Sequence, residues 1–173
     1  TTKLMGSRFD ITIVAKDEAT ADHYIDKAIE EISRIEELIS SWIPSSQTSA
    51  INLNAGIKPV KVDQELIDLI ERCITVSKIT DGAFDITYAS IDKIWRYDGS
   101  MTEMPTKEAI ENSVAKIVSQ NIVLDKTSQT VFLTLKGMKI GFGAIGKGYA
   151  ADKVRSMLKE EGVKSGIINA SGD

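Results

Sequence analysis

The chain has 173 residues, of which 42% are hydrophobic and 27% are charged, and this composition is typical of a globular protein with a buried core. The sequence contains no apolar run of the roughly 18 residues that a membrane-spanning helix needs. A net charge of −4 argues against a dedicated nucleic-acid-binding protein, which normally carries a basic face. The single cysteine, Cys73, lies in an apolar helical pattern, so we expect a buried structural thiol.

The N-terminal third of the chain predicts a strand, a long helix and a loop. Residues 7–15 alternate apolar and polar side chains, as a half-buried strand does. From Asp17 to Trp42, apolar residues recur at steps of three and four, which predicts one amphipathic helix. The Ser-rich residues 40–49 predict a loop.

Further helices are marked by capping residues. Asp63 is expected to cap a helix over residues 64–79, and Thr106 a helix that carries Ile110, Val114 and Ile117. A last helix is expected over residues 148–161, ended by Gly162.

The remaining strands lie in the C-terminal third. Two strand-like runs joined by "KTSQ" predict a hairpin. A further short apolar run, "MKIGFG", covers residues 138–143, and "GIINA" predicts a last strand. The chain shows no internal repeat and no linker. We therefore expect one α+β domain over residues 1–173, with an antiparallel or mixed β-sheet flanked by helices.

The stretch "IGFGAIGKGYAAD", residues 140–152, fits two nucleotide-binding patterns. Gly141, Gly143 and Gly146 form the G-x-G-x-x-G pattern of dinucleotide-binding folds, and Gly141 to Lys147 form the G-x-x-x-x-G-K pattern of a P-loop. Gly148 stands where a P-loop needs a hydroxyl for magnesium. A dinucleotide-binding fold needs parallel strands, which the predicted hairpin does not supply. Beyond the loop, the only acidic residue at the end of an apolar strand-like run is Asp173.

A third interpretation is that the glycines only allow a tight turn and that Lys147 is solvated. The electrostatics nevertheless favour an anionic ligand. Backbone N–H groups of a glycine loop and the positive end of the following helix attract anions. Lys147 adds a positive charge at the same end, and this charge is unfavourable unless an anion lies beside it. A diphosphate would satisfy both.

Five stretches carry a resemblance to a known family. In chain order they are "MGSRFDITI", "SSWIPSSQTSAINLNAG", "TDGAFDIT", "GAIGKGYAAD" and "GIINASGD". In these stretches the chain resembles the N-terminal half of ApbE-type FAD:protein FMN transferases, which implies an ApbE-like fold.

The resemblance implies FAD as substrate, Mg²⁺ as metal and a set of contacting residues, while it assigns no catalytic residue to this chain. The implied FAD contacts are Met5, Trp42, Asn54, Ala83, Phe84, Asp85, Gly141 and Lys147. The implied metal ligand is the backbone carbonyl of Ala144, since hard cations accept carbonyl oxygens.

Each implied contact has a structural alternative. Met5 and Phe84 are also typical core residues, and Trp42 could complete the apolar stripe of the first helix. Asp85 could be a turn or cap acid, and Asn54 a turn residue. The one histidine, His23, matches no motif of the family, so we expect a surface residue.

The chain also departs from the family's pattern. Gly141 stands where the family has an Asp, and Ile86 where it has a Pro. The family continues beyond the position of Asp173, and that part holds an Asp and Thr pair of magnesium ligands and the proposed general base. A fragment or one piece of a split protein is therefore expected, with poor catalysis by this chain alone.

The activity implied is magnesium-dependent transfer of FMN from FAD to a Thr or Ser hydroxyl of an acceptor protein, with release of AMP. The alternatives are hydrolysis of FAD to FMN and AMP, and FAD binding without chemistry. By the same resemblance, the acceptor would be a subunit of a membrane redox pump. The location would be the periplasmic face of the bacterial inner membrane, with the full-length protein a lipoprotein. A homodimer, or an association with the family's C-terminal half, is also open.

Overall fold

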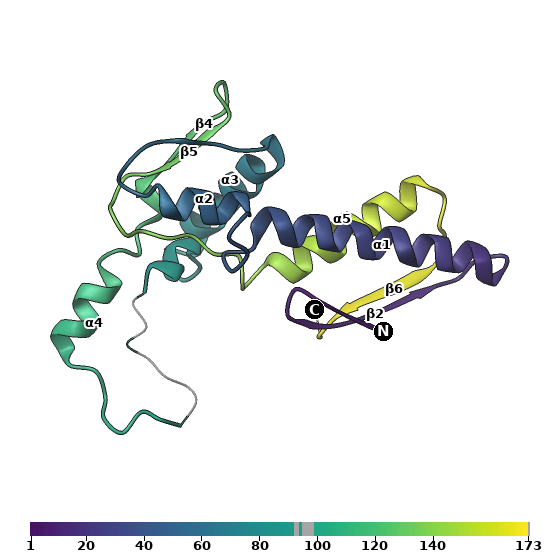
Figure 1. Ribbon diagram of the computed structural model, residues 1–173, viewed down its shortest axis with the longest axis horizontal. Helices are drawn as coiled ribbons and strands as arrows, with labels where there is room; N and C mark the ends of the chain where they lie inside the picture. Colours follow the sequence, from purple (N-terminus) through teal and green to yellow (C-terminus); the bar gives the residue numbers. More distant parts are fainter. Residues whose placement is uncertain (92–93, 95–98, 173) are drawn as a thin grey trace. The chain divides into compact units, whose positions relative to one another are not determined.

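The computed structural model describes residues 1–91, 94 and 99–172, and its chain divides into two compact units (Figure 1). Unit 1 combines Thr1–Ser40 with Phe142–Asp173, and unit 2 is Ser41–Gly141. Asp173, the end of the "SGD" sequence, lies outside the described residues. That the chain is one domain stays a prediction.

Unit 1 contains a three-stranded antiparallel sheet. Its strands are β1 (Thr2–Leu4), β2 (Ser7–Ile13) and β6 (Gly166–Ala170), in the order β1-β2-β6. Phe9 of β2 pairs with Ala170 of β6, and both side chains are fully buried. The strands predicted near residues 7–15 and at "GIINA" are therefore confirmed.

The turn between β1 and β2 is tight. Leu4 pairs with Ser7, so Met5 and Gly6 are the two turn residues, with φ of 50° and 69°. Positive φ at both central positions is the mark of a type I′ turn, which prefers Asn or Gly to a residue such as Met.

Two helices, α1 (Glu18–Ile39) and α5 (Gly146–Glu160), lie side by side along this sheet (Figure 1). Both bury an apolar stripe of residues three and four apart, as expected for amphipathic helices: Ala28, Ile32 and Ile35 on α1, and Ala150, Val154 and Leu158 on α5. Gly162 follows α5 with φ of +89°, which confirms the predicted C-terminal glycine.

The predicted bounds of these two helices need correction. α1 ends at Ile39, where Ser40 turns to an extended backbone conformation, and Trp42 lies beyond the helix with 83% of its surface exposed. α5 begins at Gly146 instead of residue 148. On α1 the apolar spacing continues past the last helical residue. On α5 it begins after the first helical residue.

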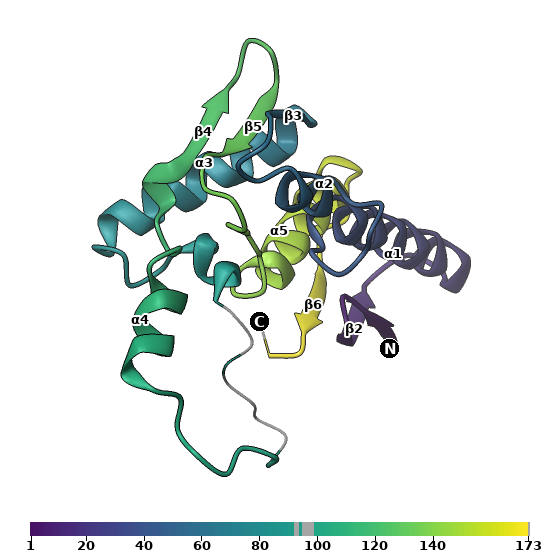
Figure 2. The ribbon, with the colours of Figure 1, turned by 60° about the vertical axis from the view of Figure 1, so that its left-hand side comes forward.

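Unit 2 is built from short elements around a second antiparallel sheet. Figure 2 shows its strands, β3 (Val60–Lys61), β4 (Ile122–Asp125) and β5 (Thr130–Leu133), in the order β3-β5-β4. Asp125 pairs with Thr130, so the predicted hairpin with its "KTSQ" turn is confirmed. The helical elements are α2 (Gln47–Leu53), α3 (Gln64–Ile79), η1 (Ile86–Ser90), α4 (Lys107–Val114) and η2 (Ser119–Asn121).

The caps of unit 2 agree only in part with those predicted. Thr106 caps α4 by accepting from the backbone N–H of Ala109 at 3.2 Å, but Ile117 lies beyond the helix end at Val114. α3 has the predicted bounds, although Asp63 makes no side-chain cap bond. The carboxylate of Asp63 accepts from the side-chain amide of Gln47 instead, at 2.6 Å.

The predicted loop over residues 40–49 is wrong at its C-terminal end, because α2 begins there. Ser46 caps α2 by accepting from the backbone N–H of Ser49 at 2.9 Å. Ser46, Thr48 and Ser49 are all buried. A Ser-rich stretch therefore forms a capped helix where its hydroxyls find partners inside the protein.

All described strand pairs are antiparallel, which confirms the α+β class and removes the dinucleotide-binding interpretation of the glycine loop. Residues 138–142 before the loop form no strand. In the described part of the chain, no helix combines the length and the apolar character that crossing a bilayer requires.

Candidate functional site

The glycine loop ends in a helix start that carries no side-chain cap. Ile145 occupies the N-cap position of α5, the first turn contains no acidic residue, and Lys147 is its second residue. The N–H of Gly146 donates to the carbonyl of Phe142 at 2.6 Å, and both residues are buried, which anchors the turn. The positive end of α5 and Lys147 therefore lie on the same turn, an arrangement that attracts anions.

Met5 lies beside this helix start within unit 1. A Cβ placed on Gly146 would lie 3.3 Å from Met5 Cε and 3.0 Å from Ile39 Cδ1, so the absence of a side chain at Gly146 lets Met5 approach. The backbone N–H of Met5 donates to Glu36 Oε2 at 2.9 Å. The structure thus brings Met5 to the loop that holds Ala144 and Lys147, and Ala144 itself is exposed.

In unit 2, the two residues before Gly141 are held by side chains instead of by a neighbouring strand. Asn52 Nδ2 donates to the carbonyl of Ile140 at 3.0 Å, and the N–H of Ile140 donates to Asn52 Oδ1 at 2.8 Å. Ser90 Oγ does the same for Lys139, donating to its carbonyl at 2.9 Å and accepting from its N–H at 2.8 Å. We call these two pairs the side-chain clamps.

The residue after the clamps is bound by backbone. The N–H of Gly141 donates to the carbonyl of Ile86 at 2.9 Å. A Cβ on Gly141 would lie 3.1 Å from Ala89 Cβ and 3.7 Å from the Tyr88 hydroxyl. Gly141 is therefore enclosed and can offer only its backbone to a ligand.

Asp85 is occupied by structural hydrogen bonds. Its Oδ1 accepts from the N–H of Thr87 at 2.8 Å and from the Thr87 hydroxyl at 2.6 Å. Its Oδ2 accepts from the N–H of Ser119 at 3.2 Å. Asp85 thus caps η1 and ties it to η2, so the cap-acid interpretation of this residue is confirmed.

The other predicted contacts of unit 2 differ in exposure. Trp42 is 83% exposed, which contradicts the view that it completes the apolar stripe of α1. Asn54 ends α2, and its Nδ2 donates to the carbonyl of Ala50 in the same helix at 2.9 Å, so the turn interpretation is confirmed. Ala83 is exposed and Phe84 is half-buried, after a turn with positive φ at Asp81 and Gly82.

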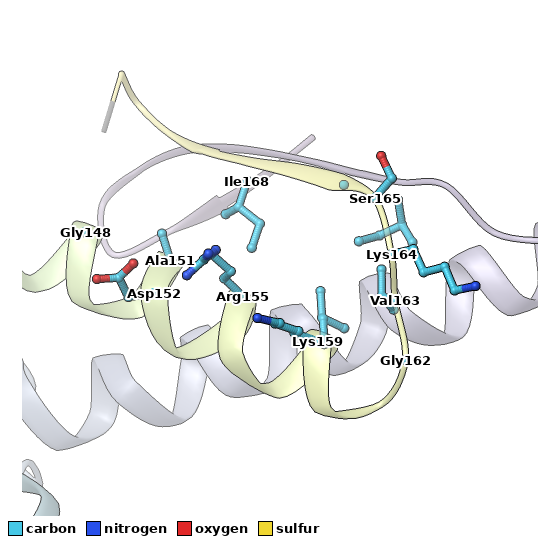
Figure 3. A pocket seen from close by; sticks show the side chains of 13 residues that line it. Gly148, Ala151, Asp152, Arg155, Lys159, Gly162, Val163, Lys164, Ser165 and Ile168 are labelled. Carbon is cyan, nitrogen blue, oxygen red and sulfur yellow. The ribbon is translucent and has the colours of Figure 1, made fainter.

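A pocket of about 890 Å³ lies along α5 and β6 in unit 1 (Figure 3). Arg155 and Lys159 from α5, Lys164 from the connecting segment and Ile168 from β6 line it. None of the predicted contact residues lines it, although Gly148, directly after Lys147, does. We therefore assign the candidate site to the glycine loop, where a helix start and a lysine coincide, and not to this pocket.

The cysteine and the histidine of the chain, two reactive residue types, have structural or surface positions. The Cys73 thiol is 2% exposed, and burial raises its pKa to about 12, so it is a structural residue, as predicted. His23 is exposed on α1, with its ring 5.7 Å from that of Tyr24, which confirms a surface residue. Within residues 1–91, 94 and 99–172, no group of three or more His, Cys, Asp or Glu side chains is placed to hold a metal.

Comparison with known sequences identifies relatives over nearly the whole chain. The sequence model of the ApbE family matches residues 5–173. A FAD:protein FMN transferase from Klebsiella pneumoniae (strain 342) is 34% identical over 170 residues, which cover 98% of this chain and 52% of the relative. One from Treponema pallidum (strain Nichols) is 26% identical over 179 residues, covering 98% of this chain and 49% of the relative. The chain spans about half the length of the curated relatives it matches.

Solved structures show the same fold. The ApbE protein of Thermotoga maritima superposes with a TM-score of 0.83 at 25% identity, covering 96% of this chain and 54% of the other. The flavin transferase ApbE of Vibrio cholerae gives a TM-score of 0.85 at 18% identity, covering 98% of this chain and 55% of the other. The ApbE-like fold expected from the five sequence stretches is thereby confirmed.

Proposed function

This chain belongs to the ApbE family, and we propose that the protein carrying it transfers FMN from FAD to a Thr or Ser hydroxyl of an acceptor protein. The observation that carries the proposal is the start of α5, which has no side-chain cap, no acidic residue in its first turn, and Lys147 as its second residue. The FAD diphosphate would be attracted to the positive end of this helix and to the Lys147 ammonium.

In this reaction the acceptor hydroxyl oxygen attacks the phosphorus on the FMN side of FAD. The bond from that phosphorus to the bridging oxygen breaks, and AMP leaves with the electron pair. The part of the chain described here would bind and orient the diphosphate through loop N–H groups and Lys147, which is a contribution of positioning and electrostatics. The proton acceptor for the hydroxyl is not assigned to any residue of this chain.

Flavin contacts are proposed from the family resemblance. Met5 is favoured by its place beside Gly146, and Trp42 by an exposed ring that could stack on an isoalloxazine. Asp85 is the weakest of these candidates, because its carboxylate already accepts three hydrogen bonds. We propose that Asp85 stabilises the backbone around the site and does not contact the flavin.

The residues present would supply only part of a magnesium site, and FAD would supply the rest. Ala144 is exposed on the loop, and Mg²⁺ commonly combines few protein ligands with waters and substrate phosphates. Ala144 would offer its carbonyl oxygen, and FAD its phosphate oxygens. When bound, the ion would neutralise charge that develops on the leaving phosphate.

The compartment and the acceptor belong to the same proposal. We propose a location at the periplasmic face of a bacterial inner membrane, with a lipid anchor on the full-length protein and a membrane redox-pump subunit as acceptor. The family resemblance supports this. Fractionation of cells that express the encoded protein, followed by mass spectrometry of the membrane fraction, would test it, and a cytosolic, unlipidated protein would contradict it.

The function is tested by mixing the complete encoded protein with FAD, Mg²⁺ and a Thr-containing acceptor domain. A mass gain of one FMN on the acceptor, with free AMP, is the expected result. Free FMN together with AMP and no change in the acceptor would indicate hydrolysis, and unchanged bound FAD would indicate binding alone. Either of these two outcomes would contradict the transferase proposal.

A further inference from the structure

We infer that Asn52 and Ser90 are positioning residues for FAD, because their clamps fix the backbone from which the chain enters the glycine loop. This inference rests on the function proposed above. Neither residue is an expected ligand contact. Their partners are Ile140 and Lys139, the residues that come directly before Gly141.

The clamps replace a missing strand neighbour. An extended segment needs partners for its N–H and C=O groups, and residues 138–141 have no strand beside them in the described part of the chain. Asn52 satisfies both backbone groups of Ile140, and Ser90 satisfies both of Lys139. Met138 and Ile140 are also fully buried, so this segment is held by its side chains and by its backbone.

The loop that follows contains Gly141 and Gly143 before α5 begins at Gly146. Glycine backbones lose the most freedom when they are ordered. Any backbone freedom that the free protein has here must be lost when a ligand binds, which lowers affinity. Fixing Lys139, Ile140 and Gly141 beforehand removes part of that cost, because the first loop residue is covalently attached to a fixed backbone.

The chain offers a matched control for each clamp. Gln47, also on α2, makes a two-bond contact through its side-chain amide, donating to Asp63 Oδ2 at 2.6 Å and accepting from the Asp63 N–H at 2.7 Å. Ser77 is buried like Ser90, and its hydroxyl bonds to that of Ser119 at 3.2 Å. Both controls lose structural hydrogen bonds that do not lead into the glycine loop.

The test measures FAD affinity and local opening in the complete encoded protein. FAD dissociation constants are obtained by calorimetry for the wild type, Asn52→Ala, Ser90→Ala, Gln47→Ala and Ser77→Ala. Amide hydrogen exchange of Lys139 and Ile140 is followed without FAD. We expect Asn52→Ala to weaken FAD binding about tenfold and to speed exchange at Ile140. Ser90→Ala should act in the same direction at Lys139, and both controls should stay within about twofold of wild type.

The outcomes separate this inference from the proposed function. Wild-type protein that does not bind FAD overturns both. If the wild type binds and Asn52→Ala binds equally well, the function stands and the positioning role is wrong. If the clamp and control variants have the same thermal stability and lose the same FAD affinity, the loss comes from a general change of structure. This result would overturn the inference as well.

Discussion

α1 and α5 belong to the same unit, but the first turns of the two helices carry charges of opposite sign. α1 begins with Asp17, whose carboxylate accepts from the N–H of Thr20 at 2.8 Å, and with Glu18 in its first turn. α5 begins with neither a side-chain cap nor an acid, and Lys147 lies in its first turn. The first helix supplies its own negative charge, whereas the first turn of the second contains no acidic residue.

The largest effect is expected when α5 is given the kind of start that α1 has. Ile145→Asp would place a carboxylate at the N-cap, where it satisfies the N–H groups and repels a phosphate. At about 5 Å and an effective dielectric constant near 20, this repulsion is about 3 kcal/mol, or roughly a hundredfold in the FAD dissociation constant. Calorimetric titration with FAD measures it.

The control for this change is Ile145→Asn, because Asn has nearly the same shape as Asp and caps a helix without a charge. It should weaken FAD binding far less than the Asp substitution does. Equal losses in the two variants would show that the side chain of Ile145 matters for packing and not for the electrostatics of the helix start.

Removing the cation should have the next largest effect. Lys147→Ala is expected to cost about 2 kcal/mol of FAD binding, the usual size for a charge-assisted hydrogen bond, which is about thirtyfold in affinity. Lys153→Ala, further along the same helix, removes the same charge from a residue whose Nζ lies 5.9 Å from the Tyr149 ring. If both variants bind FAD as the wild type does, Lys147 is not a ligand contact.

The reverse exchange on α1 should affect stability alone. Glu18→Lys gives this helix a cation in its first turn without any ligand to neutralise it. The expected loss is about 1–3 °C in Tm, measured by thermal unfolding at low salt, and it should shrink when salt screens the charge. A changed FAD affinity in this variant would mean that the two helix starts are not independent.

The smallest effect is a pH dependence at Asp17. Hydrogen bonds from Thr20 lower the pKa of the Asp17 carboxyl in the folded protein. The stability that this contributes is present above the ordinary Asp pKa of about 3.9 and is lost as the pH falls through the lowered folded value. As the pH falls from about 5 to about 3, Asp17→Asn should therefore lose less stability than the wild type. Chemical denaturation at each pH measures this loss. Parallel curves would contradict this.

What the sequence predicted well is local. Thr106 caps α4 because the partner of its hydroxyl, the N–H of Ala109, lies three residues away, and the Gly162 position after α5 needs only a left-handed backbone. The antiparallel hairpin also depends on neighbouring residues. Each of these signals acts within a few residues, where composition and spacing are sufficient.

What the sequence did not predict depends on distant partners. Asn52 was not identified because Ile140, which it clamps, is 88 residues away. α2 was missed because Ser-rich sequences suit loops and helix caps alike, and only burial of Thr48 and Ser49 decides between them. Trp42 continues the apolar spacing of α1, but spacing does not show where the helix and its core contacts end.

The Met5 turn has a consequence for how this protein can change over evolution. A Met at φ of 50° occupies a position where Asn or Gly would be more stable, so random drift under selection for folding alone should replace it. Its thioether, however, lies against the first residue of α5. With the flavin contact proposed for Met5, thermal stability and ligand recognition would favour different residues at position 5, and a stabilising exchange there would carry a loss of affinity.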